Sequence, residues 1–225
     1  AAAGEASGGG RAKLPRRTST LKEKRVLKED YDRMLSFLRH FSRSRFAPVL
    51  ADWIVAGVAT GLRPVEWQAT DIEVKEDPIA PGGRWVWLYV LNAKATNGRA
   101  NGIVRTLDLS HFTDETLRSV QRMSKAGAEW LISGEYDSMQ SQCAQLLYSV
   151  SDKLFRGKRV YSLYSMRHQF VANAKSYHEP EAVSALVGHV VTDTAVSSYG
   201  KKRSCWDPED IRDRADPVAD EVATV

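Results

Sequence analysis

The sequence is poor in cysteine and has no long apolar run. Its two cysteines, Cys143 and Cys205, are too few for a disulfide framework and match no metal-binding spacing. No stretch approaches the roughly 18 apolar residues of a membrane-spanning helix, and the Ala/Gly/Ser-rich start lacks the apolar core of a signal peptide. These absences favour a cytoplasmic protein, and they give no reason to expect a membrane partner, a metal ion or another cofactor.

Acidic residues are scarce near the start of the chain and basic residues are scarce near its end. The formal net charge is only +4, but Lys and Arg clearly outnumber acids from Arg11 to Arg45, and acids outnumber bases from Asp207 to Glu221. A basic lead-in favours binding to a polyanion such as double-stranded DNA. A solvated basic linker would have the same composition, so charge alone leaves both interpretations open.

The hydrophobic pattern predicts an α+β protein that is mainly α-helical, with helices around a small antiparallel sheet. No internal repeat is visible. Residues 1–24 are typical of a flexible basic linker, residues 25–200 of one folded domain, and residues 201–225 of a tail with a thin apolar series. Helical periodicity predicts helices over 29–41, 46–58, 114–131, 139–155, 163–177 and 179–187, and a short helix ending near Tyr199. Alternation and turn signals predict strands over 71–74, 84–91 and 103–109.

Arg63 follows a predicted helix cap at Gly61 and precedes Pro64, so it is held where two elements meet. A guanidinium group can bind two phosphate oxygens at once. Glu66, three residues on, could orient it through an ion pair. An ordinary surface Arg–Glu pair would have the same spacing, so this motif alone decides nothing.

Tyr164 and Arg167 are three residues apart on a predicted helix that Ser162 would cap, so they share a face. Arg167 would be a second phosphate clamp and Tyr164 a hydroxyl donor to the same oxygens, although a helical tyrosine more often packs in the core. We interpret the next residue, His168, as structural. His189 follows Gly188 at a helix end and could donate to a phosphate oxygen.

Two further residues complete an ordered set. Lys94 ends the aromatic strand, just before the turn of a predicted hairpin, where its ammonium group could protonate a departing 5′ oxygen of DNA. A solvated hairpin lysine is the alternative. Tyr199 lies ten residues after His189 and offers a phenol as nucleophile.

The order Thr60-Gly-Leu-Arg63-x-x-Glu66, a hairpin Lys94, x-x-x-Arg167-His, Leu186-x-Gly-His189 and then Tyr199 resembles the catalytic domain of the tyrosine recombinases, the phage-integrase family. The resemblance covers about residues 28–200. It implies a metal-independent DNA strand transferase in which a 3′-phosphotyrosine intermediate conserves the bond energy. In that family the position of Tyr164 is usually His. A phenol can donate a hydrogen bond but is no neutral-pH base, because its ordinary pKa is about 10.

The resemblance also implies assembly as a homo-multimer on DNA, with the tail docking on a neighbouring protomer. Family members usually have a helical DNA-clamping domain before the catalytic one, so we expect either an excised domain or a minimal relative. Three functions remain in view. The favoured one is a site-specific recombinase or integrase. The alternatives are a type IB topoisomerase or telomere resolvase with the same chemistry, and a DNA-binding module of this fold that cleaves poorly.

Overall fold

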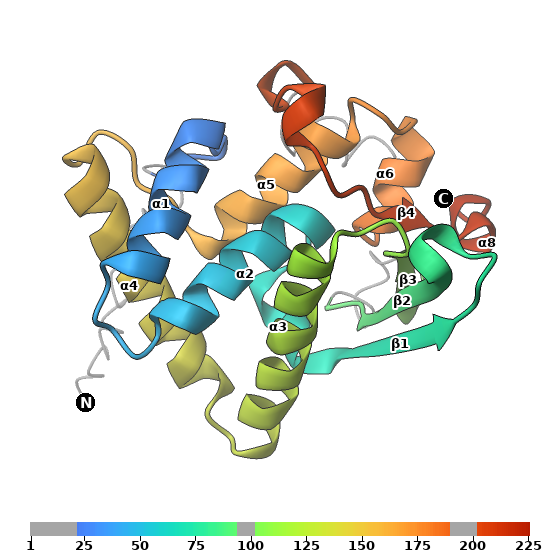
Figure 1. The fold of residues 1–225 in the computed structure, drawn as a ribbon, viewed down its shortest axis with the longest axis horizontal. Coiled ribbons are helices and arrows are strands. Elements are labelled where there is room, and N and C mark those ends of the chain that lie inside the picture. The colour runs from blue at the N-terminus through green and yellow to red at the C-terminus, as the bar shows by residue number, and fades with distance from the viewer. Residues whose placement is uncertain (1–21, 94–101, 190–201) are drawn as a thin grey trace, which may run out of the picture.

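The computed structural model describes residues 22–93, 102–189 and 202–225. Lys94, Tyr199 and the short helix predicted to end near Tyr199 lie outside these ranges, as does nearly all of the predicted basic linker. Helices make up most of the described chain, and a small sheet lies beside them at one end of the molecule (Figure 1). The described α-helices are α1 (Lys28–His40), α2 (Ala47–Thr60), α3 (Asp114–Ile132), α4 (Tyr136–Phe155), α5 (Leu163–Ala174), α6 (Pro180–Leu186) and the short α8 (Ala219–Val222).

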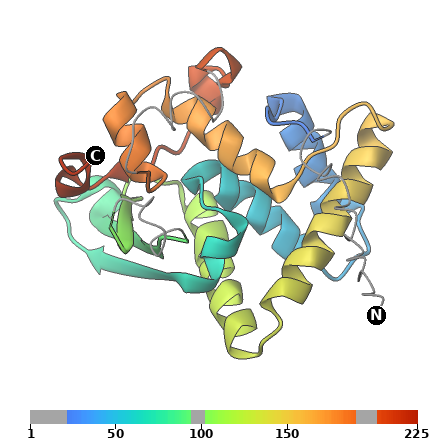
Figure 2. The same cartoon turned by 180° about the vertical axis from the view of Figure 1, so that it is seen from behind.

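Helix α2 is the centre of the core. Its sequence is apolar on nearly every face, which is the pattern of a helix buried on all sides. Helices α1, α3, α4 and α5 pack around it (Figures 1 and 2). The one acid within it, Asp52, is buried and accepts two hydrogen bonds of 2.6 Å from Arg122 of α3. The helix ends at Gly61, whose φ of 67° a residue with a Cβ adopts only with strain.

Four antiparallel strands form the sheet in the order β1 (Thr70–Glu76), β2 (Arg84–Leu91), β3 (Val104–Asp108) and β4 (Asp216–Pro217). Along β2, buried Val86, Leu88 and Val90 alternate with partly exposed aromatic residues, as a strand with one buried face requires. The predicted hairpin is confirmed, since β2 pairs with β3 in the register Leu88 to Leu107. The expected class, helices around a small antiparallel sheet, is confirmed as well.

The described part of the tail, residues 202–225, lies against its own chain. Trp206 is buried, and its indole nitrogen donates to the carbonyl oxygen of Val26 at 2.7 Å. Asp213 accepts a hydrogen bond of 2.6 Å from the backbone nitrogen of Thr113, the N-cap residue of α3. Strand β4 then adds to the edge of the sheet. Most of the tail's apolar residues are therefore covered within one chain, and docking on a neighbouring protomer stays a prediction.

The contact between α3 and the 3-10 helix η1 (Pro64–Ala69) depends on a glycine. A Cβ at Gly127 would lie 2.0 Å from the carbonyl oxygen of Trp67. We predict that Gly127→Ala destabilises the protein by up to about 2 kcal/mol, because overpacking costs about 1–3 kcal/mol and the gain in helix propensity returns about 1 kcal/mol. Urea unfolding measures the difference.

Gly134 provides the comparison, since it has a φ of 72° and no atom near a built Cβ. Gly134→Ala should lower the free energy of unfolding by only about 1–2 kcal/mol, the cost of placing a residue with a Cβ in the left-handed region. A Gly127→Ala protein more stable than the unchanged chain would show that the backbone of η1 yields at this contact.

Candidate active site

The candidate site is built around one buried carboxylate, Glu66, which belongs to η1. The Arg63 guanidinium donates from Nη1 to Glu66 Oε1 at 2.5 Å, and the Arg63 backbone nitrogen donates to Oε2 at 2.7 Å. Both hydrogen bonds run from Arg63 to the Glu66 carboxylate, and the one from the backbone nitrogen caps the first turn of η1. The predicted Arg63–Glu66 ion pair therefore exists, and it is buried, so the alternative of a surface pair is wrong.

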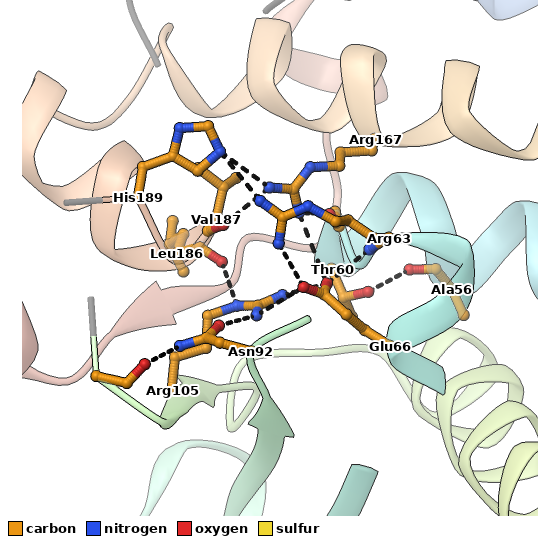
Figure 3. A network of polar contacts seen from close by, with 12 residues as sticks. Ala56, Thr60, Arg63, Glu66, Asn92, Arg105, Arg167, Leu186, Val187 and His189 are labelled. Atoms are coloured by element: carbon orange, nitrogen blue, oxygen red, sulfur yellow. Dashed lines mark hydrogen bonds and ion pairs between the residues drawn. The ribbon is translucent and has the colours of Figure 1, made fainter. Parts of the chain in front are cut away.

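Two further arginines reach the same carboxylate from distant parts of the chain (Figure 3). Arg105 of β3 donates to both oxygens of Glu66, at 2.7 and 3.2 Å. Arg167 of α5 lies 3.8 Å away, between its Nη1 and Glu66 Oε2. Burial alone raises the pKa of Glu66, but the charges of Arg105, Arg167 and Arg63 outweigh it and hold that pKa far below its usual range. Glu66 is therefore a fixed anion at neutral pH.

Backbone carbonyls fix the second arginine. Arg167 is fully buried, and it donates to the carbonyl oxygen of Gly61 at 2.6 Å and to that of Val187 at 2.8 Å. The first contact ties α5 to the end of α2, and the second ties it to the turn after α6. An arginine side chain has five donors and no acceptor, so it suits a position where both carbonyl oxygens accept hydrogen bonds.

His189 completes the set that the structure brings together. Its Nε2 lies 3.2 Å from Nη2 of Arg63 and 3.5 Å from Nη2 of Arg167. A guanidinium group has no acceptor, so Nε2 must accept from both and the imidazole must hold its proton on Nδ1. Within the described network, three guanidinium groups contact a single carboxylate, and the His189 imidazole contacts two of these arginines, which leaves an excess of positive charge.

Tyr164 has different described neighbours. Its ring lies 5.4 Å from that of His168, and both line a cavity of about 260 Å³ together with Lys22, Lys24 and neighbouring polar groups. Burial, helped by the charges of Lys24 and Arg167, lowers the pKa of His168 to about 4, so this imidazole is neutral at pH 7. A role for Tyr164 as a donor to a phosphate held by the arginines stays a prediction.

Sequence reasoning missed Arg105 and Asn92. A signal for Arg105 was present, because it stands in phase with the buried residues Leu107 and Leu109, where a strand presents its inner face. A charge at such a position requires a buried partner. Asn92, directly after β2, had no comparable signal, because an asparagine after a strand is an ordinary turn residue.

Neither a metal site nor a membrane helix is found in the described ranges. Residues 22–93, 102–189 and 202–225 contain no group of three or more His, Cys, Asp or Glu side chains that could hold a metal ion. In those ranges, no helix combines the length and the apolar character that crossing a bilayer would take.

No protein-family model and no curated protein matches the sequence. Solved structures do match. A mutant of protelomerase TelA complexed with a DNA hairpin product has a TM-score of 0.52 at 15% identity, over 85% of this chain and 60% of that chain. The XerH site-specific recombinase, bound to a palindromic difH substrate in a post-cleavage complex, has a TM-score of 0.50 at 14% identity, over 84% and 51%. These similarities confirm the expected fold, and the chain spans only about half to three fifths of these proteins' lengths.

Glu66→Gln tests the electrostatic role of the carboxylate. We predict a loss of about 3–5 kcal/mol in unfolding free energy at pH 7, because three buried cations lose their shared anion. A depressed folded-state pKa stabilises the protein fully above the unfolded value of about 4.5, and this stabilisation is lost as pH falls toward the folded value. The difference in unfolding free energy between the unchanged protein and Glu66→Gln should therefore become smaller as the pH falls from about 4.5 to about 3.5.

Urea unfolding over that pH range measures the gap, with Glu29→Gln as the control. Glu29 is exposed and lies 4.0 Å from Arg33, so its loss should change stability by less than about 0.5 kcal/mol. A Glu66→Gln gap that is independent of pH would show that Glu66 does not have the depressed pKa argued here.

Proposed function

From the fold of a tyrosine-recombinase catalytic domain, we propose that the chain cuts and rejoins double-stranded DNA through a 3′-phosphotyrosine intermediate, as a site-specific recombinase or integrase. One observation supports this most strongly. Arg63 and Arg167, from separate segments of the chain, point Nη2 donors at one atom, His189 Nε2 (Figure 3). Two guanidinium groups that converge on one acceptor are arranged for a group with several acceptor oxygens and negative charge, which describes a phosphodiester.

In the proposed complex, a non-bridging phosphate oxygen replaces the imidazole nitrogen as the acceptor for both arginines. The excess positive charge of the described network then becomes compensated. His189 would turn from an acceptor into a donor to the same phosphate once its Nε2 is protonated. Glu66 stays with Arg105 and keeps the Arg63 guanidinium in place. Donors held in advance of the reaction stabilise the extra charge on a five-coordinate phosphorus without reorganisation in the transition state.

The proposed chemistry has two more participants, Tyr199 and Lys94, both outside the described residues. The phenolic oxygen of Tyr199 bonds to phosphorus as the bond to the 5′ oxygen breaks. The phenol releases its proton to solvent, and Lys94 gives a proton to the departing oxygen, so that charge and atoms balance. Attack by another 5′ hydroxyl reverses the step and reseals DNA without ATP. The arginines supply the charge neutralisation, so we propose cleavage without a metal ion.

Several parts of the proposal go beyond one chain. We propose that residues 25–200 form the catalytic unit, that the protein assembles as a homo-multimer on paired DNA sites, and that residues 201–225 contribute to this assembly. A telomere resolvase would share the chemistry but leave hairpin ends, so the products distinguish it from a recombinase. Tyr164, in place of the usual His, supports the competing proposal of a DNA-binding module that cleaves poorly.

We predict that Tyr199→Phe abolishes covalent attachment to DNA while DNA binding stays within about twofold of the unchanged protein, because only the attacking oxygen is removed. The assay is a nicked DNA substrate carrying the native site, incubated with a chelator, on which a covalent adduct accumulates. Peptide mapping locates the attachment. An adduct on Tyr161, Tyr164 or Tyr177 instead would exclude Tyr199 as the nucleophile.

We predict that Arg167→Lys lowers the single-turnover cleavage rate at least about tenfold, because an ammonium group keeps the charge but not the planar fork. Arg122→Lys is the matched control, since Arg122 also forms a two-point contact, with Asp52, outside the described site network. It should cleave at the unchanged rate. Equal rates for all three proteins would remove Arg167 from the phosphate clamp.

A further inference from the structure

Arg105 contacts three separate parts of the candidate site. Its two Nη atoms bind Glu66, as described above, and its Nε donates to the carbonyl oxygen of Leu186 at 3.0 Å. Its Nη1 also donates to Oδ1 of Asn92. The side chain is 1% exposed, so it acts through these neighbours and has no surface of its own to offer DNA.

Asn92 extends this set of contacts to the β2–β3 hairpin. It follows β2 directly, its backbone nitrogen donates to the carbonyl oxygen of Ile103, and its Nδ2 donates to that of Gly102 at 3.2 Å. The Asn92 side chain therefore joins the end of β2 to Gly102, at the other end of the β2–β3 connection, while it accepts from Arg105. In the sequence, this connection contains Lys94.

Gly188 packs directly on the Asn92–Arg105 contact. A Cβ at Gly188 would lie 2.4 Å from Asn92 Oδ1 and 3.3 Å from Arg105 Cδ. Its φ of 63° also favours glycine. The turn that presents His189 is thus seated on the same two side chains that join the hairpin to Glu66, and little space is left for relative movement.

We propose that Asn92 and Arg105 are positioning residues for the proposed strand transfer. They hold the base of the β2–β3 hairpin at a fixed place relative to the Arg63–Glu66 pair and to the turn before His189. The group that protonates the 5′ oxygen belongs to that hairpin in the proposed function, on which this inference rests. Loss of the Asn92–Arg105 contact should therefore impair leaving-group protonation more than phosphate binding.

The charge pattern explains why Arg105 does more than neutralise Glu66. Arg105, Arg63 and Arg167 share one carboxylate, so the set has more positive charge than Glu66 alone compensates, and burial of the extra charge costs desolvation. An arginine can contact Glu66, Asn92 and Leu186 at once because its five donors point in fixed directions. A lysine could reach only one or two of these groups from the same backbone position.

The experiment compares Asn92→Ala with Asn173→Ala. Both asparagines are buried, at 3% and 4% exposure, and both accept side-chain hydrogen bonds. Asn173 contacts Gln169 and Trp206, so Asn173→Ala also removes a buried amide, but at a position outside the site. Each full-chain variant is tested on two nicked substrates with the same sequence, one with the natural 5′ oxygen and one with sulfur in that bridging position.

A thiolate leaves phosphorus without needing a proton, so the sulfur substrate bypasses the protonation step. On the oxygen substrate we expect Asn92→Ala to cleave at least about tenfold more slowly than the unchanged protein, with DNA affinity changed less than about threefold. On the sulfur substrate its rate should return to within about threefold of the unchanged protein. Asn173→Ala should match the unchanged protein on both substrates.

Two variants calibrate the readout. The sulfur substrate should restore the cleavage rate of Lys94→Ala. It should not restore the rate of Arg63→Lys, because that substitution weakens the phosphate clamp. Arg105→Lys should cleave the oxygen substrate slowly, as Asn92→Ala does. Its rate on the sulfur substrate should recover only in part, since Glu66 also loses a partner. Unfolding curves for each variant confirm that the rates compare folded proteins.

The outcomes separate this inference from the proposed function. If Asn92→Ala cleaves the oxygen substrate at the unchanged rate, or if its defect persists on the sulfur substrate, the positioning role is wrong and the proposed function stands. If the unchanged protein forms no adduct with either substrate, the proposed function itself fails and the inference falls with it.

Discussion

The buried Glu66 carboxylate is the interaction on which the described site depends. It holds Arg63 through a short ion pair and a backbone hydrogen bond, accepts two hydrogen bonds from Arg105, and lies within ion-pair distance of Arg167. These partners come from η1, β3 and α5, so one anion fixes the meeting point of three parts of the fold. Without it, three buried guanidinium groups would repel one another, and burial of uncompensated charge is strongly unfavourable.

The fold supports this arrangement from both sides. On the helical side, α2 ends at Gly61, whose carbonyl oxygen accepts a hydrogen bond from Arg167. On the sheet side, Arg105 projects from the inner face of β3 and joins the hairpin to the turn that follows α6. The network thus joins the helical part to the sheet through polar contacts, in addition to the apolar core that the two parts share.

Much of the fold was predictable because its signals are local. The apolar faces of α1 and α2, the cap at Gly61 and the alternation along β2 follow from neighbouring residues, and their boundaries came within a few positions of those observed. Order along the chain also indicated that Arg63, Arg167 and His189 belong together. The Arg105–Asn92 contact was not predictable in this way, because it depends on strand register and on a turn more than eighty residues away. The contacts of the tail within its own chain were not predictable either, because the surface that covers Trp206 is built from distant residues, Val26, Tyr31 of α1 and Asn173 of α5.

In the proposed function, Arg63 and Arg167 form a phosphate clamp that Glu66 holds ready before DNA arrives. A crystal structure of the chain bound to a DNA duplex that carries its native site tests this most directly. We expect one phosphate with non-bridging oxygens within about 3 Å of guanidinium nitrogens from both arginines, with the Glu66–Arg105 ion pair unchanged and His189 turned toward the phosphate. A complex in which DNA lies elsewhere, while Arg63 and Arg167 still donate to His189, would contradict it.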